Sequence, residues 1–154
     1  MRAIHRHCFI LALLFAAIIK GGPAMAAEGL IVKPSPHSPK ETLDRLDKIP
    51  TSKGITVFAR IDHAAGAAKV GAEMPETEVL IFGNPKMGTP LMQATPSMAI
   101  DLPLKVLAWR DDKGSWIAYN EPKWMAKRHG NEVEKVITTM TGVLDTLTNA
   151  ATAQ

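Results

Sequence analysis

The stretch Val79-Leu80-Ile81-Phe82-Gly83-Asn84-Pro85 decides the fold that we predict for this chain. Its first four residues are all apolar, and a short run without polar alternation favours a central strand that is covered on both faces. Gly83 and Pro85 end this strand, because neither residue suits the interior of a sheet. The sequence therefore predicts a buried strand that runs into a turn at Asn84.

Four further segments have the pattern of strands. Residues 55–61 alternate between apolar and polar side chains, and residues 29–33 form a short strand that Pro34 stops. Residues 104–109 and 115–119 flank an Asp-Asp-Lys-Gly turn, a composition typical of a hairpin.

The hairpin carries apolar side chains on both faces. If Trp109 pairs with Trp116, then Leu107 lies opposite Ala118 on one face while Val106 lies on the other. One layer of helices covers only one face of a sheet. The second face therefore needs another cover, from more of this chain or from a second copy of it.

Helix start signals occur at Ser38, Asp62 and Thr89, and a capping box of Asn131 and Glu134 opens a final helix with one continuous apolar stripe. The predicted fold class is α+β. We expect a single domain with a mixed sheet of about five strands, helices packed on it and a long amphipathic helix at its end.

The first 26 residues have the features of a secretory signal peptide. Arg2 and Arg6 precede an apolar run at 9–19, and Ala24-Met25-Ala26 has small residues at the cleavage spacing. The run is shorter than the roughly 20 residues that span a bilayer. We expect a periplasmic or secreted protein that begins near Ala27 and has no stable membrane insertion after cleavage.

The composition after Ala26 excludes several partners. Three of the 18 Lys and Arg residues and none of the 15 Asp and Glu residues lie before Ala27, so the mature chain has no net charge. A neutral chain without a dense basic cluster gives no electrostatic reason to bind nucleic acid or an anionic membrane. Cys8, the single cysteine, leaves with the leader, so we expect no disulfide.

Four short segments carry a resemblance to a known family. They are Ile61-Asp62-His63-Ala64, Phe82-Gly83-Asn84-Pro85, Gly88-Thr89-Pro90 and Asp101-Leu102-Pro103. The series resembles the domain of unknown function 302 family, from about Leu30 to His129. The resemblance implies a compact α+β fold, a homodimer and a signature position for His63, but no activity.

Polar residues of these segments make up the candidate site. Strand–helix–strand units usually give parallel neighbours, so we expect the strand ends before His63 and Asn84 to emerge at one edge of the sheet. Ligands collect at such an edge, where helix N-termini offer free N–H groups. Asp101 and Tyr119 complete a ligand-binding cluster of four residues, to which we assign no cofactor.

Each of these residues also has a structural interpretation. In this interpretation Asp62 caps a helix and His63 hydrogen-bonds to a loop. Asn84 braces a turn, and Asp101 caps the turn that follows it. Tyr119 packs in the sheet with its hydroxyl at the edge.

Three classes of function stay open. The preferred one is a non-enzymatic dimer that binds a small molecule or a partner near His63 and Asn84. A copper or zinc protein is the first alternative, although the six Met and three His residues of the mature chain form no Met-x-x-Met or His-x-His pair. A hydrolase-like enzyme that uses His63 is the second, although no nucleophile elbow or His-Glu-x-x-His motif occurs. We assign no catalytic or metal-ligating residue.

Overall fold

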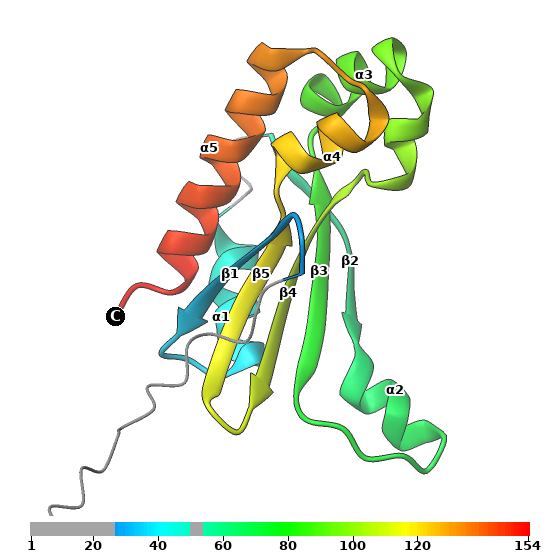
Figure 1. Cartoon of the computed structure of the whole chain (residues 1–154). Coiled ribbons are helices and arrows are strands. Elements are labelled where there is room, and N and C mark those ends of the chain that lie inside the picture. The colour runs from blue at the N-terminus through cyan, green and yellow to red at the C-terminus, as the bar shows by residue number, and fades with distance from the viewer. Residues whose placement is uncertain (1–26, 50–53) are drawn as a thin grey trace, which may run out of the picture.

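The computed structural model describes residues 27–49 and 54–154, which form one five-stranded sheet with helices around it (Figure 1). The strands are β1 (Leu30–Ser35), β2 (Thr56–Asp62), β3 (Thr77–Gly83), β4 (Leu104–Asp111) and β5 (Gly114–Asn120), in the sheet order β1-β5-β4-β3-β2. The predicted α+β class and the number of strands are confirmed. The predicted signal peptide lies outside the described residues.

The helices occur in the predicted order. They are α1 (Pro39–Lys48), α2 (His63–Lys69), α3 (Pro85–Ala94), the 3₁₀ helix η2 (Pro96–Ile100), α4 (Pro122–His129) and the long α5 (Glu134–Ala151). Two starts differ from the prediction. Asn84, not Thr89, precedes the first residue of α3. Asn131 does not cap α5 but donates from Nδ2 to the backbone oxygen of Leu91 at 2.8 Å, which ties the start of α5 to α3.

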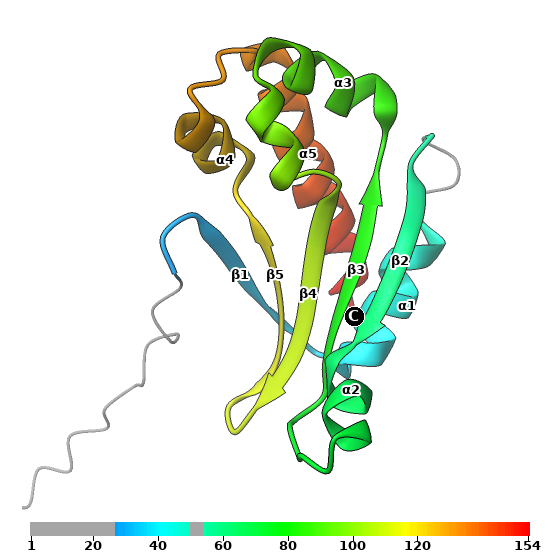
Figure 2. The same ribbon diagram turned by 90° about the vertical axis from the view of Figure 1, so that its right-hand side faces the viewer.

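Every strand pairs antiparallel to its neighbours, so the expected parallel pairing was wrong. Parallel neighbours need a connection that returns along the whole strand. Helix α2 has seven residues and is therefore only about 10 Å long, whereas the seven residues of β2 span about 23 Å. Figure 2 shows α2 beyond the end of the sheet, from where the chain turns back into β3.

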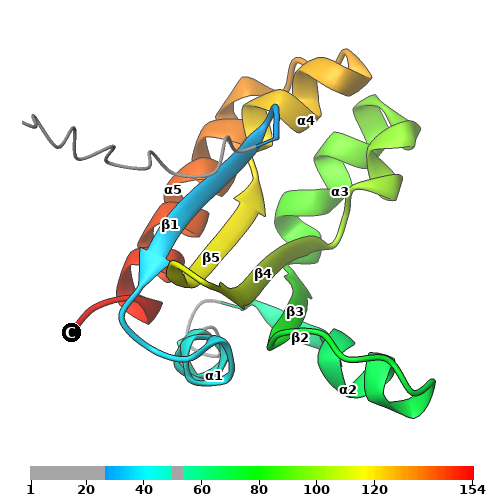
Figure 3. The same cartoon turned by 60° about the horizontal axis from the view of Figure 1, so that its bottom comes forward.

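Helices α1 and α5 cover one face of the sheet, and Figure 3 shows both on the same side. Side chains that face them are buried in alternation along the central strands, as in Leu80 and Phe82 of β3 and Val106 and Ala108 of β4. The apolar stripe of α5 packs on this face through Ile137, Met140, Leu144 and Leu147. This contact between α5 and the sheet is the main core of the domain.

The opposite face of the sheet is apolar and only partly covered. Trp109 lies opposite Trp116 with ring centroids 6.4 Å apart, and Leu107 lies opposite Ala118, so the predicted hairpin register is confirmed. Val79 of β3 pairs with Leu107, and both side chains are half-buried. Within the described residues, β3 is thus not covered on both faces as its apolar run had predicted.

Both edge strands are interrupted. The register of β2 against β3 shifts between Val57 and Ala59, and the side chain of Phe58 in this bulge is 54% exposed. Strand β1 contains Pro34, which has no N–H to donate. Bulges and prolines at sheet edges hinder pairing with another chain.

Candidate functional site

The antiparallel sheet separates the two residues that were expected to share a rim. His63 follows the end of β2, whereas Asn84 follows the end of β3. Gly83, the last residue of β3, pairs with the first residue of β2. His63 and Asn84 therefore lie at opposite ends of this strand pair, about 20 Å apart along it. The four predicted residues do not form one cluster.

His63 lies in the first turn of α2, and its side chain is exposed. The helix start is held by Asp62, whose Oδ1 accepts from the backbone N–H of Ala65 at 2.8 Å. Asp62 is thus the helix cap of the structural interpretation. No residue of α2 is buried. A ligand-binding role for His63 stays a prediction.

Asn84 has a defined structural role at the start of α3. Its Oδ1 accepts from the backbone N–H of Lys86 at 2.9 Å, so the side chain satisfies one of the free donors of the helix N-terminus. Pro85 follows at the first helical position, where a missing N–H costs nothing. The cap also fixes Asn84 in the wall of a pocket.

The pocket is an apolar cavity of about 200 Å³ at the end of the sheet beside α3 and α5. Its wall includes Phe82, Met87, Met92, Leu102, Met140 and Val143. Three of the four segments that carry the family resemblance contribute to it, namely residues 82–85, 88–90 and 101–103. The fourth segment, around His63, does not.

The chemistry of the pocket wall is set by thioethers and aliphatic groups. Met87, Met92 and Met140 come from α3 and α5, and methionine adapts its shape to different apolar ligands because it is unbranched and polarisable. Asn84 and Thr89 supply polar side chains to the lining. A few polar groups in an otherwise apolar wall orient a bound molecule.

Asp101 does not cap a turn with its carboxylate. Its Oδ2 lies 2.8 Å from Nε2 of His129, and both of its oxygens lie 3.3 Å from Nη1 of Arg128. The side chain thus joins the end of η2 to the end of α4. Asp101 is absent from the pocket wall although the next residue, Leu102, belongs to it.

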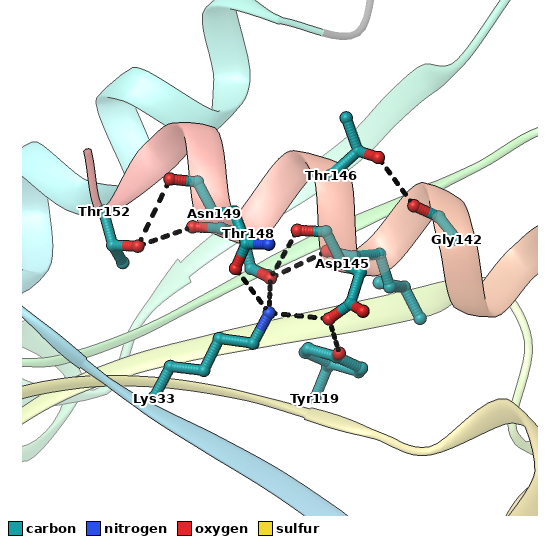
Figure 4. Close-up of polar contacts among 9 residues, drawn as sticks. Lys33, Tyr119, Gly142, Asp145, Thr146, Thr148, Asn149 and Thr152 are labelled. Atoms are coloured by element: carbon teal, nitrogen blue, oxygen red, sulfur yellow. Dashed lines mark hydrogen bonds and ion pairs between the residues drawn. The ribbon is translucent and has the colours of Figure 1, made fainter.

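Tyr119 lies in a polar network between the sheet and α5 (Figure 4). Lys33 Nζ donates to Asp145 at 2.7 Å, to Thr148 at 2.9 Å and to Asn149 at 2.8 Å. The Tyr119 hydroxyl donates to the same oxygen of Asp145 at 3.0 Å. Tyr119 therefore packs in the sheet as its structural interpretation predicted, but its hydroxyl faces α5 and does not lie at an edge of the sheet.

The network shifts two titrations in opposite directions. Hydrogen bonds from Lys33, first, and from Tyr119 hold the pKa of the Asp145 carboxyl below its ordinary value. Burial, followed by the hydrogen bond to Asp145, raises the pKa of the Tyr119 phenol. Both shifts favour the charged Asp145 and the neutral Tyr119 that the hydrogen bonds require.

A metal site has little support from the arrangement of side chains. Across residues 27–49 and 54–154, no three His, Cys, Asp or Glu side chains gather where they could hold an ion. His37 binds the backbone oxygen of Ala153, and His129 binds Asp101, so these two imidazoles lie in different contacts.

Apart from Asn84 and Tyr119, sequence reasoning missed the residues that line the pocket and form the network. Met87, Met92, Met140 and Lys33 received no role in binding. A signal for the first two was present, because Met87 lies between two of the segments with the family resemblance and Met92 lies just after one of them. Lys33 and Asp145 are 112 positions apart, so no local pattern joins them.

A family model described as "Domain of unknown function DUF302" matches residues 31–147. The chain belongs to the DUF302 family. A crystal structure of an uncharacterized conserved DUF302 protein from Bacillus stearothermophilus has the same fold, with a TM-score of 0.73 and 13% sequence identity over 81% of this chain and 99% of that one.

This DUF302 chain is also similar to curated bacterial proteins. The fluoride-specific ion channel FluC 1 of Brucella suis is 44% identical over 118 residues, which are 74% of this chain and 46% of the relative. The FluC 1 protein of Brucella abortus matches equally, over 44% of its length. The chain thus spans less than half the length of these relatives. None of the helices in the described part of the DUF302 chain combines the length and the apolar composition that a bilayer crossing requires.

The lowered pKa of Asp145 makes the Lys33 network sensitive to acid. Because the folded-state pKa is depressed, its contribution is present above the unfolded value of about 3.9 and is lost as pH falls through the folded value. Asp145→Asn should lower the free energy of unfolding at pH 7 by less than about 1 kcal/mol, since the carboxylate is 56% exposed. Urea unfolding from pH 7 to pH 2 should show a shallower acid loss than in the parent.

The control for this measurement is Asp112→Asn. Asp112 is exposed in the hairpin turn, and its substitution should leave the acid loss as steep as in the parent. An unchanged acid loss in Asp145→Asn would show that the network contributes nothing to the pH dependence.

Proposed function

We propose that this DUF302 protein is a binding module that takes up a small apolar molecule, without chemical change, at the pocket beside Asn84. The observation that carries the proposal is the pocket itself, an apolar cavity with thioethers from two helices and an amide side chain in its wall. A concave apolar site with few polar groups is the usual form of a small-molecule site. The absence of recognised catalytic motifs in the sequence agrees with it.

The volume limits the size of the ligand. A cavity of about 200 Å³ is smaller than the roughly 300–1,000 Å³ of sites for drug-sized molecules. It exceeds the engineered apolar cavity of about 150 Å³ that binds benzene. The ligand class is therefore a single aromatic ring with a short substituent, or an aliphatic chain of similar volume.

The names of the curated relatives suggest fluoride, but the pocket does not suit that ion. Moving a small anion from water into an apolar cavity carries a large desolvation cost unless charges or donors surround it. The pocket wall contains no Lys or Arg side chain. The relatives named for fluoride conduction are more than twice as long as the matched part. We therefore do not propose fluoride conduction for this chain.

Export and dimer formation complete the proposal. The leader features at residues 1–26 favour a periplasmic or secreted protein. The half-buried apolar face of the sheet, with Leu107, Trp109 and Trp116, is the surface that a second copy would cover. The pocket lies at the end of the sheet, so such a dimer would leave room for a ligand.

Methyl groups of methionine offer a direct test of the pocket. The mature chain has six methionines, of which Met87, Met92 and Met140 line the pocket. In protein labelled with ¹³C at these methyls, titration with indole or ethylbenzene should shift the three pocket resonances and leave those of Met74 and Met125 unchanged. Unchanged spectra across such a panel of apolar probes would contradict the proposal.

A substitution that fills the cavity controls this titration. Val143 lines the pocket from α5 and is half-buried, so Val143→Trp should occupy the space and abolish the shifts in a protein that still folds. Thr139→Trp, at an exposed position of the same helix, should retain them. Equal responses from both variants would place the probe outside the pocket.

The role of Asn84 in ligand binding can be separated from its role in capping. Asn84→Ala should destabilise the protein by about 0.5–2 kcal/mol because it removes the cap. Asn84→Asp keeps an oxygen for the N–H of Lys86 but removes the amide donor. It should melt near the parent temperature and bind acetophenone about fivefold more weakly, with ethylbenzene affinity unchanged. If calorimetry showed an equal loss of affinity for both probes, Asn84 would act only as the cap of the helix.

The open sheet face predicts the outcome of a dimer test. The mature protein should sediment with twice the mass of one chain. Leu107→Glu puts a charge into the apolar face and should yield a folded monomer, because an unpaired buried charge is costly. Lys113→Glu, in the exposed hairpin turn, should remain dimeric. A monomeric parent would remove the dimer from the proposal.

A further inference from the structure

Three side chains outside the pocket form a continuous hydrogen-bonded chain. Oγ of Ser97 in η2 lies 2.9 Å from Nδ1 of His129, the last residue of α4. Nε2 of the same imidazole lies 2.8 Å from Oδ2 of Asp101, which follows η2 directly. Both imidazole nitrogens are thus committed, one to a hydroxyl and the other to a carboxylate.

The three side chains of this hydrogen-bonded series differ in their exposure to solvent. The side chains of His129 and Asp101 are only 8% and 11% exposed, whereas Ser97 is an exposed residue. Arg128 lies 3.3 Å from both oxygens of Asp101, and Lys105 donates to the backbone oxygen of Asp101 at 3.4 Å. Arg128 fixes the orientation of the carboxylate, and the Ser97 hydroxyl belongs to the residue that solvent reaches.

We propose that Ser97, His129 and Asp101 form a serine nucleophile site for acyl transfer. A hydroxyl becomes nucleophilic when an imidazole accepts its proton, and a carboxylate on the other ring nitrogen orients that base and stabilises the imidazolium. Either ring nitrogen can accept the proton. Such a site is defined by geometry and roles, not by sequence position. Ser97 is the catalytic nucleophile, His129 the general base and Asp101 a positioning residue.

The net reaction is the hydrolysis of an ester, and water is the only other reactant. Ser97 Oγ forms a bond to the carbonyl carbon of an ester, and its proton moves to Nδ1 of His129. The bond from that carbon to the leaving oxygen breaks, and His129 gives the proton to the departing alcohol. Water then attacks the acyl group, gives its proton to His129 and releases the acid, which regenerates the Ser97 hydroxyl.

The position of Ser97 on the surface sets the substrate class. Ser97 does not line the apolar pocket, and the exposed hydroxyl meets its substrate from solvent. Small activated esters with a short acyl group fit this position. The site is independent of the ligand proposed for the pocket, so either proposal can fail alone.

The test is acetylation of the mature protein by 4-nitrophenyl acetate. Peptide mass mapping should place one acetyl group on Ser97, and the release of nitrophenolate should accompany the formation of this adduct. Ser97→Ala should lose the adduct. His129→Gln should slow the release of nitrophenolate about 100-fold. The circular dichroism spectrum and the melting temperature of Ser97→Ala should stay close to those of the parent.

Further variants separate the catalytic arrangement from a structural clasp. Asp101→Asn should slow acetylation about tenfold, and Asp101→Glu should restore part of the rate, because only a carboxylate orients the base. The exposed variant Thr139→Ala should react like the parent. No adduct on Ser97, or an adduct that forms equally fast in His129→Gln, would overturn the proposal and leave the three residues as a link between η2 and α4.

Discussion

The packing of α5 on the covered face of the sheet is the contact on which the rest of the structure depends. Its middle supplies Leu144 and Leu147 to the core. Its first half forms one wall of the pocket through Met140 and Val143. Its second half binds Lys33 of β1 through three polar side chains. One helix therefore fixes the core, the cavity and the position of an edge strand together.

The parts of the fold that follow from local sequence patterns could be predicted. Alternation and turn composition located the hairpin to within two residues at each strand end, and the assumed pairing of Trp109 with Trp116 is the one that occurs. The direction of β3 relative to β2 was not predictable from a general preference for crossovers, because it depends on the length of α2 against the length of the strands. Because the strands are antiparallel, His63 lies far from Asn84, and the four predicted residues do not form one cluster.

The candidate site shows the same limit. Asn84 was expected to share a rim with His63 and lies instead in the wall of a cavity, and its side chain caps a helix where a turn had been predicted. Asp101 was chosen for the sequence that follows it, but its partners, Arg128 and His129, reach it from α4. Contacts that close over 28 or 112 positions depend on tertiary packing and leave no periodic trace in the sequence.

The interruptions in both edge strands have a consequence for how copies of this chain can meet. A bulge at Phe58 and a proline at position 34 make each rim a poor template for another strand. Strand addition can repeat without end and so leads to fibrils, whereas two identical faces that pack on each other satisfy one another and stop at two. The apolar face can therefore remain uncovered in a single chain with less risk of open-ended polymerisation.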